Sequence, residues 1–538
     1  MTFRTAFAAL SVAALVAPVD ATAQPRVMAL SPHDEALYRD AFEAIDAHNW
    51  HAVTTALSRV DDNTLEETVR GRMLASPSYR ASYGTLTQWL ARHGDLAVAQ
   101  AVYERAQDAR PHRGRGRRRH AVGVAPPEPD PMMRRTLPGT PPDVVGDSAY
   151  TRSAISDLAE RVGNGDDTGA RAIGAEQLSG PRSGQAAWWL GLLAYRSHDY
   201  AEATRQFEVA AAWPYFGGWA SAGAHYWAAR ARLATGDATG VAQHLEAAAQ
   251  RPWTFYGQLA EAQLGRASAL DFTSPTIDAT ALRLFIDAHP EARRATMLAQ
   301  LGRLSEVEGE LRRLHGSLQQ HDDQSFLALA VALQAPSAQL RAAEFGGPAQ
   351  ASGFCPDTTF QPSGGFALDR ALVYAIVRQE SYFNPTARSV SNARGLMQLL
   401  PSTARDMDRS VNYRRQPGAL SDPNLNLSLG QDYVQWLMSE FHSDRDLARV
   451  FASYNGGPGW LSRWLATQSA DIDPLLMLET MPRQESRDYA ERVLSHMALC
   501  RKRYGQEPLE LDAMAAGRPA IYQPQDRVAG AAAPTTTR

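Results

Sequence analysis

The stretch Ala371-Leu372-Val373-Tyr374-Ala375-Ile376-Val377-Arg378-Gln379-Glu380 carries the strongest structural signal in the 538-residue chain. Leu372 and Ile376 precede Glu380 by eight and four residues, so at helical spacing the three lie on one face. That face is apolar, and burial of a carboxyl group raises its pKa. A carboxylic acid that keeps its proton near neutral pH can protonate a glycosidic oxygen. The pattern therefore predicts a general acid at Glu380, and the alternative is a surface carboxylate at a helix end.

Five ordered motifs extend from this helix. They are Glu380-Ser381 with Asn384-Pro385, Gly395-Leu396-Met397-Gln398, the segment 422–430, Tyr454-Asn455-Gly456-Gly457-Pro458-Gly459, and Glu485-Ser486-Arg487-Asp488-Tyr489. Together they resemble the catalytic domain of the soluble lytic transglycosylases, lysozyme-like enzymes that cleave peptidoglycan. The resemblance covers roughly residues 365 to 504. Two departures are mild: Val390 follows Ser389 where the family has proline, and Ser453 stands where it has alanine.

The resemblance implies a reaction with one carboxylic acid. Most glycosidases need two carboxyl groups, and no second Asp or Glu lies between Glu380 and Gln398. In the implied reaction Glu380 protonates the leaving oxygen, and the N-acetyl group of N-acetylmuramic acid attacks its own C1. Glu380 then accepts the proton of the C6 hydroxyl, which gives a 1,6-anhydro ring without water.

Several polar and aromatic side chains near these motifs are candidates for support or substrate binding. Tyr454 can orient Glu380 through its phenol, and the alternative is a core aromatic residue. The expected substrate-binding residues are Ser389, Met397, Gln398, Asn455 and Glu485. A structural polar role for Ser389 and Gln398, a core position for Met397, and an ion pair of Glu485 with Arg487 remain open.

The N-terminal part has helical periodicity and a repeat. Trp189 to Trp227 is 38 residues, and Asp199 to Asp237 is also 38 residues. Such a period indicates paired antiparallel helices stacked as an α-solenoid of the tetratricopeptide type. The expected fold is therefore mainly all-α, with an N-terminal superhelix followed by a lysozyme-like α+β catalytic domain.

The domain boundaries follow from composition. We expect a signal peptide over 1–23 cleaved after Ala23, an α-superhelical domain over 24–345, a linker over 346–365, a catalytic domain over 366–505 and a disordered tail over 506–538. The basic, proline-rich segment 110–143 is expected to be a linker or long loop. Export to the periplasm follows from the signal peptide, with no membrane segment after processing.

Charge and cysteine content limit the other function classes. The formal net charge of −4 argues against a nucleic-acid binder. Two cysteines and the lack of a metal-ligand motif predict no metal and no cofactor. Cys355 and Cys500 either form a disulfide in an oxidising compartment or remain separate buried thiols. The expected partner is the glycan strand of peptidoglycan, with cell-wall enzymes as further partners of the solenoid. Competing functions are a hydrolytic muramidase and a glycan-binding scaffold whose solenoid recruits a protein.

Overall fold

The computed structural model describes residues 27–110, 140–440 and 444–526. Within these ranges the protein is built from helices, and its only β-pairing consists of isolated bridges, including Arg388 with Arg394 and Arg394 with Leu399. The mainly α-helical prediction is confirmed. The expected signal peptide and most of the basic segment 110–143 lie outside the described residues. In the described part, no helix is both long enough and apolar enough to cross a membrane.

The N-terminal arm consists of two helical groups. One group joins α1–α3 with α13–α17 through a single apolar core that includes residues from both ends of the arm, and α4 and α5 pack on α3. Its helices are α1 (Pro32–Asp46), α2 (Trp50–Leu57), α3 (Glu66–Ala75), α4 (Tyr83–His93), α5 (Ala99–Asp108), α13 (Ala279–Ala288), α14 (Pro290–Gln300), α15 (Leu304–Ser317), α16 (Asp323–Ala332) and α17 (Pro336–Gly346). The second group is α6 (Ala149–Asn164), α7 (Asp167–Gln177), α8 (Ser183–Arg196), α9 (Tyr200–Ala211), α10 (Gly218–Thr235), α11 (Val241–Ala249) and α12 (Phe255–Gln263).

The predicted 38-residue repeat lies in the second group. Trp189 is in α8 and Trp227 is in α10, and both side chains are buried. Asp199 caps α9 by accepting a hydrogen bond from the backbone of Glu202, as an N-cap aspartate does. Gly236 ends α10 with a φ of 78°, a conformation that favours glycine. Short turns between successive helices force neighbours to run in opposite directions, as a solenoid requires.

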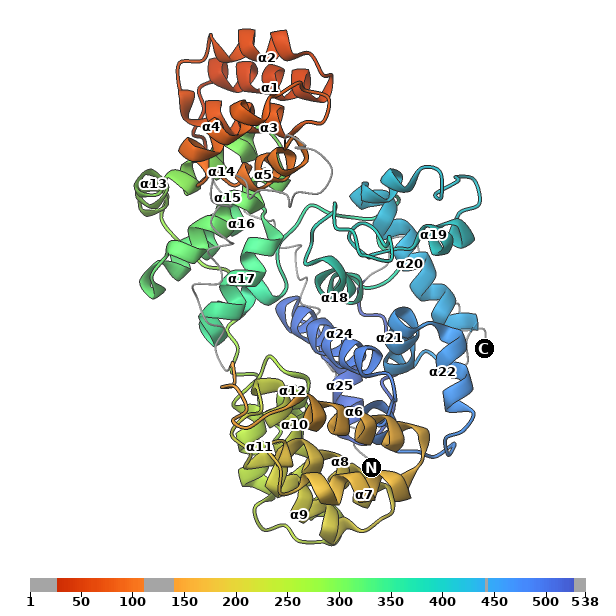
Figure 1. The fold of residues 1–538 in the computed structure, drawn as a ribbon. Helices are drawn as coiled ribbons and strands as arrows, with labels where there is room; N and C mark the ends of the chain where they lie inside the picture. The colour runs from red at the N-terminus through yellow and green to blue at the C-terminus, as the bar shows by residue number, and fades with distance from the viewer. Residues whose placement is uncertain (1–26, 111–139, 441–443, 527–538) are drawn as a thin grey trace, which may run out of the picture.

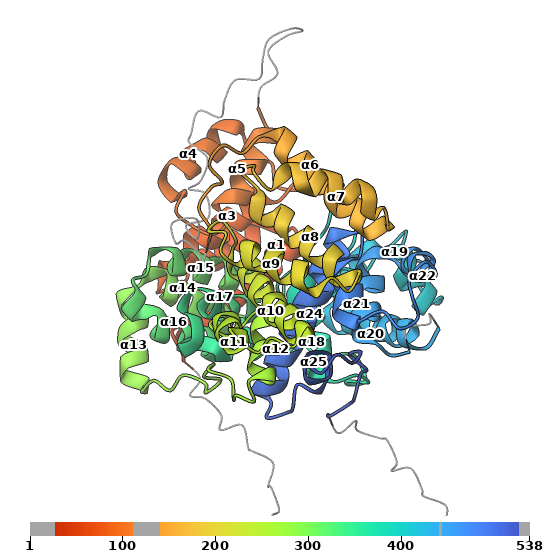
Figure 2. The same cartoon turned by 90° about the horizontal axis from the view of Figure 1, so that it is seen from below.

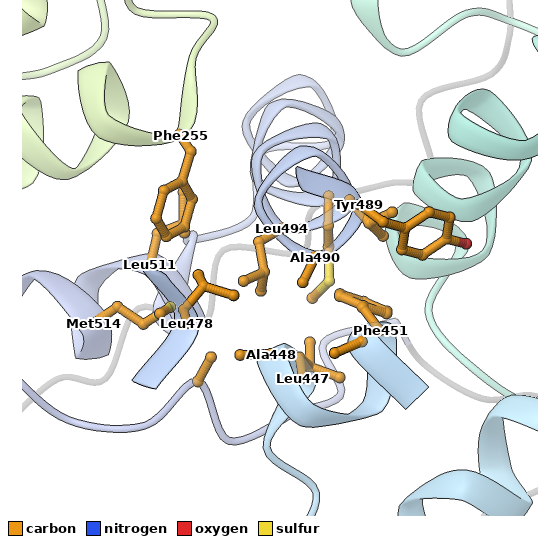
Figure 3. Packing of buried hydrophobic residues seen from close by; sticks show 14 of the residues in the cluster. Phe255, Leu447, Ala448, Phe451, Leu478, Tyr489, Ala490, Leu494, Leu511 and Met514 are labelled. Carbon is orange, nitrogen blue, oxygen red and sulfur yellow. The ribbon is translucent and has the colours of Figure 1, made fainter. Parts of the chain in front are cut away.

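The C-terminal domain lies beside the arm in both views (Figures 1 and 2). Its helices are α18 (Arg370–Ser381), α19 (Pro401–Met407), α20 (Pro423–Glu440), α21 (Leu447–Gly456), α22 (Pro458–Leu465), α23 (Pro474–Glu479), α24 (Gln484–Arg503) and α25 (Leu509–Ala515). The 20-residue helix α24 packs against α18 and α21 on the domain side and against α12 of the arm. Figure 3 shows the shared core, where Phe255 of α12 lies beside Leu511 and Met514 of α25.

Polar contacts add to this apolar junction. Arg230 of α10 makes two hydrogen bonds to the Asp473 carboxylate, at 2.7 and 3.1 Å. The Trp464 indole donates to the carbonyl of Gly163 in α6 at 2.9 Å. Both contacts join residues more than 200 positions apart and hold the C-terminal domain against the arm.

Two segments near the predicted domain boundaries pack against other parts of the protein. The connecting segment 346–365 includes the 3₁₀ turn Gly347–Phe354, and Phe354 packs with Leu270 and Leu499. The predicted disordered tail is wrong for residues 506–526, while 527–538 lie outside the described residues. The Asp369 carboxylate accepts hydrogen bonds from the backbone amides of Gln525 and Asp526, which holds this segment against the start of α18.

The open cysteine question is answered by a disulfide between Cys355 and Cys500. The bond joins the segment before α18 to α24 and closes a loop of 145 residues. It therefore ties α24 to the segment that leads into α18.

Candidate active site

Glu380 lies in the last turn of α18, as the sequence predicts. Leu372 and Ile376 are fully buried on its helix face. Burial raises the pKa of the Glu380 carboxyl to about 7; a hydrogen bond from Tyr489 lowers this pKa and the charge of Glu485 raises it further. The side chain therefore remains partly protonated near neutral pH, which is the property a general acid needs.

A tyrosine of α24 holds the acid. The hydroxyl of Tyr489 donates to Oε1 of Glu380 at 2.7 Å, across 109 residues of sequence. The other oxygen, Oε2, makes no hydrogen bond to any residue that the structure describes. The contact fixes the orientation of the carboxyl group and leaves Oε2 as the atom that can meet a substrate.

The expectation that Tyr454 hydrogen-bonds Glu380 is not met. Tyr454 lies in α21, and its hydroxyl donates to the carbonyl of Met397 at 2.7 Å. Its ring stacks on Tyr489 with centroids 6.1 Å apart and planes 9° apart. Tyr454 therefore supports the tyrosine that holds Glu380. Tyr489 closes the fifth sequence motif, but sequence spacing could not decide which of the two phenols reaches the acid.

The Gly395-Leu396-Met397-Gln398 motif forms a tight turn beside this pair. Asn426 of α20 accepts a hydrogen bond from the Met397 amide at 2.8 Å and donates to the carbonyls of Arg394 and Leu420, each at 2.9 Å. Gly395 has a φ of 77°, and a Cβ there would lie 2.2 Å from the Leu420 carbonyl oxygen. Only glycine fits this position.

Three candidate substrate-binding residues of this region have structural contacts. Met397 is fully buried and packs closely against Gly430, which favours the core alternative over a cleft wall. The Gln398 amide donates to the carbonyls of Ala387 and Gly395, at 3.1 and 2.9 Å. Ser389 accepts from the Ala393 amide at 3.0 Å, which closes a turn. The hydroxyl group of Ser389 and the amide oxygen of Gln398 remain available to hydrogen-bond a substrate.

Asn455 and Glu485 form the opposite part of the site. Asn455 accepts a hydrogen bond from Ser486 at 2.8 Å, and its amide lies 3.5 Å from Oε1 of Glu485. Glu485 is exposed. The ion pair between Glu485 and Arg487, which the sequence left open, does not form. The Arg487 side chain is instead buried on the side of α24 that faces the arm, where it contacts Glu479. Glu485 thus stays available to solvent at the start of α24.

No group of three His, Cys, Asp or Glu residues suited to a metal ion occurs in the ranges described. What the site offers is one desolvated carboxylic acid, a phenol that orients it, and polar groups nearby that are partly or fully exposed. This arrangement can transfer a proton to a leaving oxygen and take one back.

The comparisons agree with this site and fold. Residues 357–475 match the family model of the transglycosylase SLT domain. The match contains Glu380 and Tyr454 and ends before α24, which supplies Tyr489. Among curated proteins, the soluble lytic murein transglycosylase of Escherichia coli K12 is 34% identical over 158 residues, or 29% of this chain and 24% of the relative. That of Salmonella typhimurium is 36% identical over 145 residues, or 27% of this chain and 22% of the relative. The matched region thus spans about a quarter of these relatives.

Solved structures extend the likeness to the arm. The 70 kDa soluble lytic transglycosylase of Escherichia coli aligns with a TM-score of 0.56 at 16% identity, over 88% of this chain and 97% of that chain. The lytic transglycosylase Slt of Pseudomonas aeruginosa aligns with a TM-score of 0.53 at 20% identity, over 91% of this chain and 74% of that one. The chain therefore carries a transglycosylase SLT domain. Its arm and catalytic domain together have the fold of the soluble lytic transglycosylases.

Proposed function

We propose that the protein is a peptidoglycan lytic transglycosylase. It cleaves the β-1,4 bond between N-acetylmuramic acid and N-acetylglucosamine and leaves a 1,6-anhydro ring on the muramic acid. The observation that carries this proposal is the buried Glu380, held by Tyr489 in a domain that matches the transglycosylase SLT family. A raised carboxyl pKa, here about 7, is what an acid catalyst of glycoside cleavage requires.

The reaction runs in two proton transfers through one side chain. Glu380 donates its proton from Oε2 to the glycosidic oxygen as the bond from C1 breaks, while the substrate's acetamido oxygen attacks C1. The resulting carboxylate then accepts the proton of the C6 hydroxyl. The C6 oxygen displaces the acetamido oxygen at C1 and closes the anhydro ring. Glu380 ends protonated again, and no water is consumed.

The surrounding residues have supporting roles in this proposal. Tyr489 is a positioning residue that holds Oε1, and Tyr454 braces Tyr489. Ser389, Gln398, Asn455 and Glu485 supply polar groups for the sugars. Peptidoglycan lies outside the cytoplasmic membrane, so the proposed place of action is the periplasm. The disulfide between Cys355 and Cys500 supports an oxidising compartment.

Digestion of purified peptidoglycan tests the proposal. The wild-type protein should release anhydro-muropeptides, identified by mass spectrometry, and Glu380→Gln should lose activity by at least the roughly 10²–10⁴-fold value of general acid catalysis. Gln keeps the volume of the side chain but has no proton to donate. Glu160→Gln, an exposed change of the same kind on α6, is the matched control and should retain full activity.

Two other outcomes separate the competing functions. Products with reducing ends would identify a hydrolytic muramidase. Binding to peptidoglycan without any product would identify a glycan-binding scaffold. A Glu380→Gln protein that keeps more than about a tenth of the wild-type rate would exclude Glu380 as the acid, since loss of general acid catalysis should cost far more.

A further inference from the structure

The turn that follows Glu380 has an uncommon backbone conformation. Helix α18 ends at Ser381, and the next two residues, Tyr382 and Phe383, have φ values of 55° and 63°. Both lie in the left-handed region, which is unfavourable for a residue with a side chain and which glycine usually occupies at a helix end. A chain keeps such a conformation only where surrounding contacts hold it. The contacts of Tyr382 therefore bear on the position of Glu380.

Helix α17 of the arm holds Tyr382 at three points. The Ser337 hydroxyl donates to the Tyr382 carbonyl at 2.7 Å. The Tyr382 hydroxyl donates to Oε2 of Glu344, and the guanidinium carbon of Arg341 lies 5.5 Å from the centroid of the tyrosine ring. Ser337, Arg341 and Glu344 are separated by four and three residues, so they lie on one face of α17. Together these contacts form the α17 clamp, which holds the carbonyl, the ring and the hydroxyl group of Tyr382.

The carboxylate of Glu344 also contacts α18 on the other side of Glu380. Its Oε1 lies 3.6 Å from the guanidinium of Arg378, while its Oε2 accepts the hydrogen bond from Tyr382. Arg378 is buried and donates to the carbonyl of Phe354 at 3.0 Å. Arg378 and Tyr382 are each two residues away from Glu380 in sequence. One side chain of the arm therefore holds the turn of α18 that carries the acid from both sides.

Helix α17 is itself fixed where it begins. Glu308 of α15 accepts hydrogen bonds from the backbone amides of Ser337 and Ala338, at 2.8 and 3.0 Å. A carboxylate at this place satisfies amides that the first turn of a helix leaves without a partner. Because these contacts stay within the arm, the clamp is built on a support that does not depend on α18.

Two helices thus hold the acid in different ways. Tyr489 of α24 bonds to Oε1 of the Glu380 side chain, whereas α17 holds the backbone turn from which that side chain extends. A side chain that is bonded at one oxygen still moves when its backbone moves. A displacement of about 1 Å at a reacting group can lower a rate about 10²-fold. The direction of Oε2 therefore depends on both helices.

We propose that Tyr382 is a positioning residue, through which Ser337 and Glu344 of the arm keep the last turn of α18 in the conformation that directs the Glu380 acid toward the glycosidic oxygen. The catalytic consequence rests on the proposed function, while the clamp itself is testable without a reaction. The alternative is that the same contacts only join the arm to the catalytic domain.

Two substitutions of Tyr382 separate these roles. Tyr382→Ala and Tyr382→Gly remove the same ring and hydroxyl group, but glycine adopts the left-handed conformation at little cost. If the clamp keeps the turn left-handed, the kcat of Tyr382→Gly should exceed that of Tyr382→Ala at least about fivefold, since the left-handed conformation disfavours a side chain by about this factor. The KM for soluble glycan strands should be the same in both variants. Equal kcat values would overturn the proposal.

Two milder substitutions each remove one hydrogen bond of the clamp. Tyr382→Phe and Ser337→Ala should each lower kcat roughly 2- to 10-fold, as for a lost hydrogen bond, and leave KM unchanged. Tyr150→Phe, which removes a tyrosine–glutamate bond at the surface of the arm, is the matched control for the first. Ser58→Ala, which removes a bond from an exposed hydroxyl to a backbone carbonyl, is the control for the second. Both controls should keep the wild-type kcat, and clamp variants that do the same would show that the contacts only join the two regions.

Hydrogen exchange measures the clamp without a reaction. The Tyr382 amide donates to the Arg378 carbonyl at 3.2 Å, so its exchange reports opening of the last turn of α18. In mass spectrometry of the peptide covering this turn, Tyr382→Phe and Ser337→Ala should exchange faster than the wild-type protein, and the two controls should not. Unchanged exchange in both clamp variants would overturn the proposal. If they exchange faster but the wild-type protein releases no product from peptidoglycan, the proposed function fails and the clamp stands.

Discussion

Two arginine clusters, one in the arm and one in the catalytic domain, show how differently the two regions use charge. Arg161 on α6 pairs with Asp157 and Asp166 at the surface, where all three side chains are exposed. Arg501 on α24 is fully buried between Asp369 and Glu510, at 3.2 and 2.8 Å. The arm has its own buried pair, Arg294 with Glu310. The C-terminal domain also buries the Glu380 carboxyl group, which has no ion-pair partner among the described residues.

This difference shows that the burial of a charged side chain, and not its charge alone, decides what that side chain does. Surface pairs are screened by water and contribute little. A buried carboxyl such as Glu380 has a shifted pKa and can do chemistry, while a buried arginine must be held by partners. Surface pairs such as that of Arg161 are therefore replaceable, whereas the buried pairs of Arg294 in the arm and of Arg501 in the C-terminal domain depend on both partners.

The largest effect on stability should come from Arg501→Met, and the same substitution at the surface residue Arg161 is its comparison. Arg501→Met leaves the carboxylates of Asp369 and Glu510 buried without their cation, which should cost about 3–5 kcal/mol of the free energy of unfolding. It should also release the segment that ends near Asp526, since Asp369 holds it. Arg161→Met should leave the thermal midpoint unchanged. Calorimetry of both variants checks this, and equal midpoints would remove the proposed contrast.

Reduction of the disulfide should come next in size. Cys355 and Cys500 are the only cysteines of the chain, so a reducing agent acts on this one disulfide. Removing a native disulfide costs about 2–4 kcal/mol in typical cases. The thermal midpoint of unfolding should therefore be lower in dithiothreitol. A double Cys→Ala variant, which should not respond to the reductant, is the control. A midpoint that the reductant leaves unchanged would contradict a stabilising role of the disulfide.

The activity should fall as the pH rises through about 7. Glu380 must carry its proton to begin the reaction, and its raised pKa places the loss of that proton near this value. The rate of anhydro-muropeptide release measured from pH 5 to pH 9 should show this alkaline limb. If the rate instead fell near the ordinary pKa of a carboxyl group, with no activity left at neutral pH, Glu380 would not be desolvated in solution.

The smallest effect distinguishes the two tyrosines. Tyr489→Phe removes the hydrogen bond that lowers the pKa of Glu380, so the alkaline limb should move to higher pH. Its rate should fall roughly 2- to 10-fold, as for a lost hydrogen bond of about 0.5–1.5 kcal/mol. Tyr454→Phe should leave the limb in place, because its hydroxyl bonds to Met397. A limb that moves in Tyr454→Phe and not in Tyr489→Phe would reverse these roles.

The sequence predicts those parts of the site that depend on local order. Helical periodicity alone places Glu380 below Leu372 and Ile376, and α18 has this arrangement. The 38-residue spacing of Trp189 and Trp227 predicts the stacked helices of the arm, because each repeat must cover the apolar face of its neighbour. In both cases the signal lies within at most three consecutive helices.

The sequence fails where distant segments meet. The composition of residues 506–526 indicates a loose tail, but the buried carboxylate of Asp369 holds its backbone. The same limit applies to Met397, whose burial depends on the close approach of Gly430. Such contacts depend on partners that local composition does not reveal.

By itself, then, the sequence determined the helical class, the candidate acid and the family resemblance, since these rest on periodicity and motif order. The tertiary structure decided that Tyr489 holds Glu380, that Cys355 pairs with Cys500, and that the arm packs against α24. The physical reason is that a hydrogen bond across 109 residues and a disulfide across 145 depend on how α18, α24 and the arm pack together. Packing brings these groups within bonding distance, and no local pattern records that distance.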